Sequence, residues 1–219
     1  MLETLTDVEA RVLGSLVEKQ LTTPEYYPLT LNALTAACNQ KSNRDPVVSY
    51  DDTTITGAVD TLRDKNLVYL FYGSNSRAVK YKHMLPSVYD LEPAGVAIVA
   101  VLLLRGPQTL GELRERTGRL YEFSGMGEVQ ETLDGLIRRD DPLIIKLERQ
   151  PGQKEARYAH LLCGEVVQNV TTQSTPETIA TSATGKNERI ENLEEQIETL
   201  RGEFASLRQT FEEFRKQFE

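Results

Sequence analysis

The sequence is poor in the residues that most metal and catalytic sites use. Only two cysteines and two histidines occur among 219 residues, and tryptophan is absent. Cys38, Cys163, His83 and His160 are scattered, without the close spacing of zinc ligands, so we expect no metal, no cofactor and no Cys–His catalytic pair. Two cysteines so far apart also make no disulfide framework, which fits a reducing compartment.

Long apolar segments and nucleotide-binding motifs are missing too. The longest apolar run, Val96–Leu104, is far below the ~20 residues that cross a bilayer. The N-terminus lacks the basic start and apolar stretch of a signal peptide, and neither a P-loop nor a GxGxxG loop is present. These absences predict a non-enzymatic, cytoplasmic protein without a membrane partner.

Charge is spread unevenly along the chain. The net charge is -8, and residues 163–219 carry 6 Lys and Arg against 11 Asp and Glu, so most of the acidity lies at the C-terminal end. Residues 1–162 are close to neutral. Neither half of that region is basic enough to indicate nucleic-acid binding by charge alone.

What the sequence does contain is a repeat. Leu67–His83 and Leu143–Leu162 each read as two β-rich segments around a turn, and each follows three helix-like stretches. Three helices and a hairpin are the outline of a winged helix. We therefore predict a mainly α fold with small β-hairpins (α+β), made of tandem winged-helix domains at residues 1–90 and 91–162.

Several helix ends can be placed from local signals. Thr6 with Glu9, and Thr109 with Glu112, have the spacing of capping boxes, in which two side chains satisfy the first free amides of a helix. Pro93 suits the first turn of a helix. The third helix of the first half is expected to begin with Asp52 or Thr53 as its cap.

The C-terminal region predicts self-association. Residues 163–186 are polar and rich in Thr and Ser, as in a flexible linker, and residues 187–219 carry a heptad seam of a coiled-coil helix. The predicted oligomerisation residues are Ile190, Leu193, Ile197, Leu200, Phe204, Leu207, Phe211, Phe214 and Phe218. A contact between Glu203 and Arg208 favours a parallel pair, whereas the bulky phenylalanines leave a trimer or tetramer open. The alternative is a helix that packs back on its own domains.

Several strings in both halves resemble the bacterial YceH family. They are Ala10–Gly14, Glu18–Gln20, Thr22–Glu25, Tyr27–Leu29, Ala37–Lys41 with Asn43 and Arg44, Leu102–Gly106, Gly111–Leu113, Tyr121–Ser124 and Tyr158–Leu161. The resemblance covers about the first 165 residues. It implies a tandem winged-helix fold in a soluble bacterial protein, but it implies no reaction and supplies no functional residues.

Double-stranded DNA is one predicted partner. In helix-turn-helix proteins the third helix of the unit enters the major groove, and neighbouring loops contact phosphates. On this pattern the contact residues would be Lys41, Asn43 and Arg44 in a loop, Thr53, Thr54 and Thr56 on the third helix, Arg77, Lys80 and Lys82 in the first hairpin, and Arg149, Lys154 and Arg157 in the second.

A protein partner is the alternative. Both predicted third helices carry acidic residues, among them Asp52, Asp60 and Glu131, which would repel a phosphate backbone. The winged helices would then be docking surfaces of a scaffold. A contiguous positive face would favour DNA, whereas an apolar or mixed patch would favour a protein.

Overall fold

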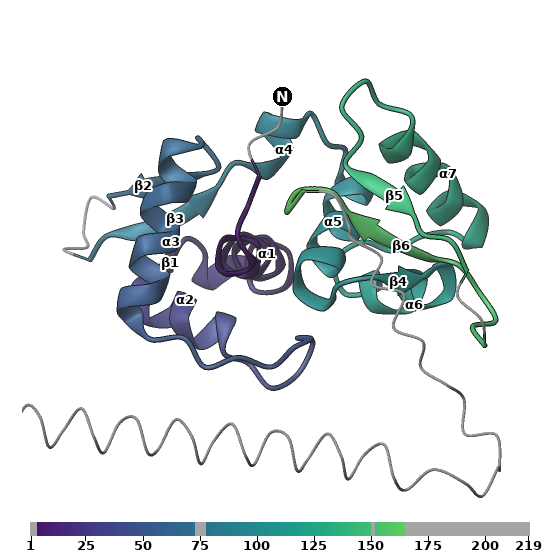
Figure 1. The fold of residues 1–219 in the computed structure, drawn as a ribbon. Helices are drawn as coiled ribbons and strands as arrows, with labels where there is room; N and C mark the ends of the chain where they lie inside the picture. Colours follow the sequence, from purple (N-terminus) through teal and green to yellow (C-terminus); the bar gives the residue numbers. More distant parts are fainter. Residues whose placement is uncertain (1–3, 73–77, 150–151, 165–219) are drawn as a thin grey trace, which may run out of the picture. The chain divides into compact units, whose positions relative to one another are not determined.

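The computed structural model describes residues 4–72, 78–149 and 152–164, and its two halves repeat one order of elements (Figure 1). The first half contains α1 (Asp7–Thr22), the short turn η1 (Pro24–Tyr26), β1 (Leu29–Thr30), α2 (Leu31–Cys38), α3 (Asp52–Asp64), β2 (Val68–Phe71) and β3 (Lys80–His83). The second contains α5 (Pro93–Arg105), β4 (Gln108–Thr109), α6 (Leu110–Thr117), α7 (Met126–Ile137), β5 (Ile144–Lys146) and β6 (Arg157–His160). A short helix that the sequence did not predict, α4 (Leu85–Tyr89), joins the halves.

Each half closes with a small antiparallel sheet of the same topology. The strand order is β1-β3-β2 in the first sheet and β4-β6-β5 in the second. The hairpin registers also correspond, since Val68 lies opposite His83 and Ile144 opposite His160. The predicted α+β class with small hairpins is confirmed, and the edge strands β1 and β4, each of two residues, complete the sheets.

Local capping signals fix several helix starts as predicted, with one exception. Thr6 Oγ1 accepts a hydrogen bond from the Glu9 amide at 3.2 Å, and Glu9 Oε2 accepts one from the Thr6 amide at 2.6 Å. Thr109 and Glu112 form the same reciprocal pair at the start of α6. For α3 the prediction of Asp52 or Thr53 is wrong by one or two residues, because the cap is Asp51, whose Oδ1 accepts from the Thr54 amide at 2.7 Å.

The two halves share one hydrophobic core, because α1 packs along α5. In Figure 1, α1 is seen end-on, with the first sheet on one side and α5 on the other. A Cβ atom added to Gly14 of α1 would lie 2.9 Å from Leu104 Cγ and 3.0 Å from Leu103 Cβ. The glycine therefore allows the two helix backbones to approach closely. Helix α5 also packs against α6, α7 and β6, so its apolar run Val96–Leu104 is buried on all sides.

Some predictions fall on parts of the chain that lie outside the described residues. They are the coiled coil, Arg77, and the linker apart from Cys163 and Gly164. Within the described ranges, no helix is both long and apolar enough to cross a membrane.

Candidate nucleic-acid interface

Arg44 is buried, so its prediction as a DNA contact is wrong. Its Nη2 atom donates to Glu18 Oε2 at 2.6 Å and to the carbonyl oxygen of Ala37 at 2.8 Å. The Arg44 side chain has no exposed surface, and that of Glu18 is 11 % exposed. This cation ties the loop after α2 to α1 and cannot reach a phosphate.

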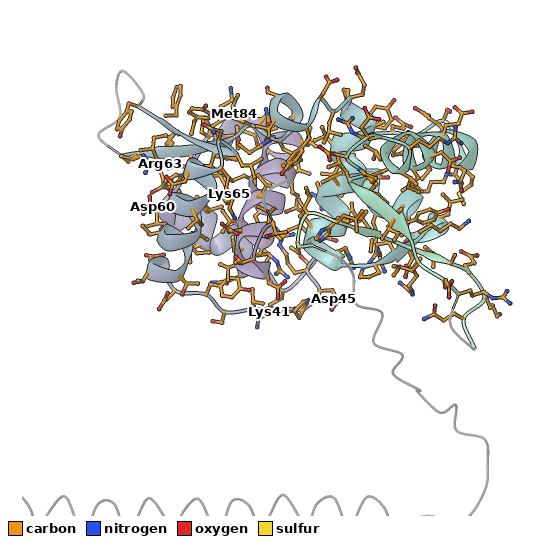
Figure 2. All side chains as sticks on the ribbon, turned by 45° about the horizontal axis from the view of Figure 1, so that its top comes forward. Lys41, Asp45, Asp60, Arg63, Lys65 and Met84 are labelled. Atoms are coloured by element: carbon orange, nitrogen blue, oxygen red, sulfur yellow. The ribbon has the colours of Figure 1, made fainter. Side chains whose placement is uncertain are left out.

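The other two residues predicted in this loop are exposed but differ in their contacts. Asn43 Oδ1 accepts a hydrogen bond from Arg105 Nη1 of α5 at 2.9 Å, so the asparagine links the two halves. Lys41 lies near Asp45 at one edge of the first half in Figure 2. Of the three predicted loop contacts, only Lys41 remains as an exposed cation.

The exposed side of α3 is acidic. Thr53 and Thr54 are exposed as expected, but Thr56 is half-buried and its Oγ1 donates to the carbonyl oxygen of Asp52 at 2.7 Å. The exposed acids of this helix and its cap are Asp51, Asp52, Asp60 and Asp64. Figure 2 shows Arg63 beside Asp60, with which it forms an ion pair of 3.0 Å. Phosphates approaching the three threonines would meet the negative charge of Asp51 and Asp52.

Hydrogen bonds hold one of these acids in its charged form and tie another to a neighbouring helix. Amide and hydroxyl donors of Thr54 keep the pKa of Asp51 below its usual value. Asp52 Oδ1 accepts a hydrogen bond from Thr35 Oγ1 at 2.6 Å, which ties the start of α3 to α2. Hydrogen bonds within the fold therefore hold both acidic side chains at this end of the helix.

In the second half, fewer of the predicted DNA-contact residues are free to bind a phosphate than the sequence suggested. Arg157 is half-buried, and its Nη1 donates to Glu112 Oε2 at 2.9 Å and to the carbonyl oxygen of Pro107 at 2.8 Å. These bonds pair Arg157 with a carboxylate of its own half, although 36 % of its side chain stays exposed, so its charge is already partly neutralised. Arg149 and Lys154 are exposed. The neighbouring helix α7 presents Glu131 and partly exposed Asp134, so it too is acidic.

One face of the first sheet combines aromatic rings with lysines. Along β2 the side chains alternate, with Val68 buried and Tyr69 and Phe71 exposed at 51 % and 46 %. Lys82 of β3 lies directly opposite Tyr69, and Lys80 lies opposite Phe71. Residues opposite each other in an antiparallel pair have Cβ atoms about 5 Å apart, so each ring has a lysine beside it. We call Tyr69, Phe71, Lys80 and Lys82 the lysine–aromatic face.

The opposite side of the same sheet is packed against the core. Tyr81 and His83 alternate with the two lysines of β3 and are buried. The hydroxyl of Tyr27 accepts a hydrogen bond from the His83 amide at 2.7 Å, and His83 Nδ1 accepts one from the Leu85 amide at 3.3 Å. These contacts fix the strand that carries both lysines.

The second sheet has no matching face. Ile145 of β5 occupies the position that corresponds to Tyr69, and its partner on β6 is Ala159. Lys146 Nζ lies over the Tyr158 ring, 5.7 Å from its centre, in a cation–π contact. The repeat therefore conserves the architecture of the hairpin but not the chemistry of its surface.

Burial favours the neutral forms of both histidines and of the Cys38 thiol. Burial lowers the pKa of His83 and of His160 to about 4. Burial raises the pKa of the Cys38 thiol to about 11, so this thiol is not a nucleophile near neutral pH. Among the residues that the structure describes, no group of three His, Cys, Asp or Glu could hold a metal ion.

Sequence reasoning overlooked the two aromatic residues of the face. It treated Leu67–His83 as a hairpin but did not use the alternation of Val68, Tyr69, Leu70 and Phe71, which predicts that every second side chain points away from the core. The order of the strands was also needed. It places β2 at an edge and β3 in the middle, so the lysines lie beside the rings.

Comparison with known proteins identifies relatives across bacteria. The sequence model of the family described as "Protein of unknown function, DUF480" matches residues 5–153. A UPF0502 protein of Opitutus terrae is 56 % identical over 166 residues, which cover 75 % of this chain and 72 % of the relative. A UPF0502 protein of Geotalea daltonii is 50 % identical over 192 residues, covering 88 % of each chain.

A third relative matches a similar length of the chain. A UPF0502 protein of Aliivibrio salmonicida is 48 % identical over 192 residues, which cover 85 % of this chain and 87 % of the relative. The matched region of the family contains α1 to β5, and hence the shared core and the lysine–aromatic face. The chain belongs to the DUF480 family, whose members include these UPF0502 proteins.

Proposed function

We propose that the protein is a non-enzymatic DNA-associated protein of regulatory or architectural type, and that the lysine–aromatic face contacts the DNA. We also propose that each half is a winged helix. Support for the second proposal comes from the order helix, strand, helix, helix, strand, strand, with the last strand in the middle of the sheet. We propose as well that the chain is related to the YceH family, which its sequence resembles.

The observation that carries the DNA proposal is the register of β2 and β3. It places a lysine beside each exposed ring, Lys82 by Tyr69 and Lys80 by Phe71. Lysines bind phosphates through charge, and exposed rings stack on bases or pack on sugars. The acidic side of α3 makes reading of the major groove by that helix unfavourable, so contact by the hairpin is the arrangement that the charges favour.

Fluorescence anisotropy with a labelled duplex and its single strand tests this proposal. Replacing both Tyr69 and Phe71 with Ala should weaken binding of the single strand, because each unpaired base stacked on a ring contributes about 1–3 kcal/mol. The loss for the duplex should be smaller, because its bases are already stacked on one another. Ile145→Ala is the matched control, since Ile145 occupies the corresponding position of the second sheet. Equal affinity of the double variant and the control would contradict a role for the rings.

A second candidate is a protein-docking scaffold, and the position of β2 favours it. This strand is at the edge of its sheet, so one side of its backbone is open to pairing with an extended peptide. Exposed aromatic side chains are also typical anchors of protein interfaces. The salt dependence of the binding affinity distinguishes the two functions. Binding that depends on phosphate weakens steeply as the salt concentration rises, whereas strand pairing does not.

Self-association through residues 187–219 completes the proposal. A seam of apolar residues at heptad spacing is unfavourable in water unless another helix covers it, and identical helices are the simplest cover. Light scattering should show an oligomer for the full chain and a folded monomer after truncation at Thr184. A monomeric full chain would contradict the coiled coil, and an oligomer that survives truncation would place the interface within residues 1–184.

A further inference from the structure

A small cavity lies where the two halves meet, and its wall is partly apolar, from Val101, Leu104 and Leu120. Its polar side comes from Glu18 and Thr22 of α1, Asn43 of the loop after α2, Arg105 of α5, Arg116 of α6, and Arg119 in the turn that follows. Both halves of the repeat thus contribute to it. None of these residues belongs to the lysine–aromatic face.

The charges around this cavity do not cancel. Three arginines line it against one acid, Glu18, and that carboxylate is already paired with the buried Arg44 at 2.6 Å. Arg116 contacts Glu112 at 3.4 Å, but Glu112 also accepts from Arg157 at 2.9 Å. The wall therefore keeps a surplus of positive charge.

One donor in the wall is unsatisfied. Arg105 Nη1 donates to Asn43 Oδ1, whereas Arg105 Nε is buried and has no hydrogen-bond partner among the described residues. Burial, followed by repulsion from Arg116, lowers the pKa of Arg105. A buried donor without an acceptor costs free energy that a bound oxygen atom would recover.

The size of the cavity limits what can enter. Its volume is about 30 Å³, whereas a single water needs roughly 10–15 Å³ measured in this way. The enclosed space therefore admits two oxygen atoms of an anion. The rest of the anion would lie on the solvent side, where Asn43 and Arg119 of the lining are exposed. Guanidinium groups bind the oxygens of phosphate particularly well, because their N–H donors form a planar fork.

We propose that this cavity is a phosphate-binding site, in which Arg105, Arg116 and Arg119 hold the oxygens of inorganic phosphate or of a small phosphomonoester. Because residues of both halves surround it, the bound anion would tie α1 to α5 and α6. The site would therefore respond to a small anionic molecule independently of DNA.

Isothermal titration of the full chain with inorganic phosphate tests the site, with chloride at equal ionic strength as the reference. Arg119→Gln should lower phosphate affinity about tenfold, because one charge-assisted hydrogen bond is lost. Arg119 is exposed and has no ion pair within the described part of the chain, so the variant should fold normally. Arg114→Gln, an exposed arginine of α6 that does not line the cavity, is the charge-matched control.

Phosphoserine in place of phosphate distinguishes the two sources of the anion. Tighter binding of phosphoserine would assign the site to a phosphomonoester, and tighter binding of phosphate would assign it to the free ion. No saturable binding of either, or equal affinity of the Arg119→Gln and Arg114→Gln variants, would overturn the proposal. Binding that survives Lys80→Ala with Lys82→Ala would separate this site from the DNA surface.

Discussion

At the scale of single residues, the buried ion pair of Arg44 and Glu18 ties the loop after α2 to α1. Replacing Arg44 with Met should lower the free energy of unfolding by about 3–5 kcal/mol, because the nearly buried Glu18 carboxylate would lose its partner. Arg63→Met is the control. It breaks an exposed ion pair with Asp60, so its cost should stay within about 1 kcal/mol.

Urea denaturation of both variants measures the difference. A loss for Arg44→Met as small as that for Arg63→Met would show that Glu18 finds water or another donor once its partner is removed.

The two histidines, His83 buried and His160 half-buried, predict a specific loss of stability in mild acid. Burial lowers their pKa to about 4 in the folded chain, whereas an unfolded histidine titrates near 6.5. The unfolded state therefore binds more protons between these values. Stability is complete above about pH 6.5 and falls as pH drops toward 4, by up to about 1.4 kcal/mol per pH unit for each histidine.

Urea denaturation between pH 7 and pH 5 checks this slope. His83→Asn keeps an acceptor for the Leu85 amide but removes the titrating group, so its stability should fall less steeply with pH than that of the unchanged chain. Identical slopes would mean that His83 gains a proton in the folded state at ordinary pH.

At the scale of elements, the contact between α1 and α5 sets how the halves meet. Gly14→Ala would place a Cβ 2.9–3.0 Å from the side chains of Leu103 and Leu104, and such overpacking costs about 1–3 kcal/mol. Gly57→Ala in α3 is the matched control, since nothing lies within 4 Å of its added Cβ. It should stabilise the protein by roughly 0.4–1 kcal/mol.

Thermal denaturation of the two variants gives the sign of each change. Gly14→Ala should melt below the unchanged chain and Gly57→Ala above it. A Gly14→Ala protein that melts normally would mean that the two helices can move apart at little cost.

The sequence predicted those elements whose signals are local. The capping boxes at Thr6 and Thr109 involve residues three positions apart, so they could be found without knowing the fold. The strand β1 could not, because its two residues are defined by pairing with Lys80 and Tyr81, about fifty positions away. A strand of that length has no periodicity to detect.

The candidate surface was predicted less well, because exposure depends on tertiary packing. Lys80 and Lys82 were expected in the first hairpin, and the structure places both on β3. In the sequence, Arg44 and Arg157 cannot be distinguished from exposed arginines. In the structure, each forms an ion pair with an acidic residue of another element. Only the fold shows which cations are already neutralised.

At the scale of the whole molecule, a shared core implies that the halves unfold together. Because α1 packs on α5, opening either half exposes the apolar surface of the other. Native-state hydrogen exchange should therefore give the slowest amides of α3 and of α7 opening free energies that agree within about 1 kcal/mol. A difference of several kcal/mol would show that the halves are separate folding units.

The proposal that joins these scales is that the lysine–aromatic face contacts DNA, and the salt dependence of binding tests it most directly. Replacing Lys80 and Lys82 with Ala should weaken binding to duplexes of every sequence and make the slope of log affinity against log salt shallower by about two units. Lys146→Ala with Arg138→Ala removes the same charge from the second half and should leave the slope unchanged. A slope that is the same in both double variants would contradict the proposal.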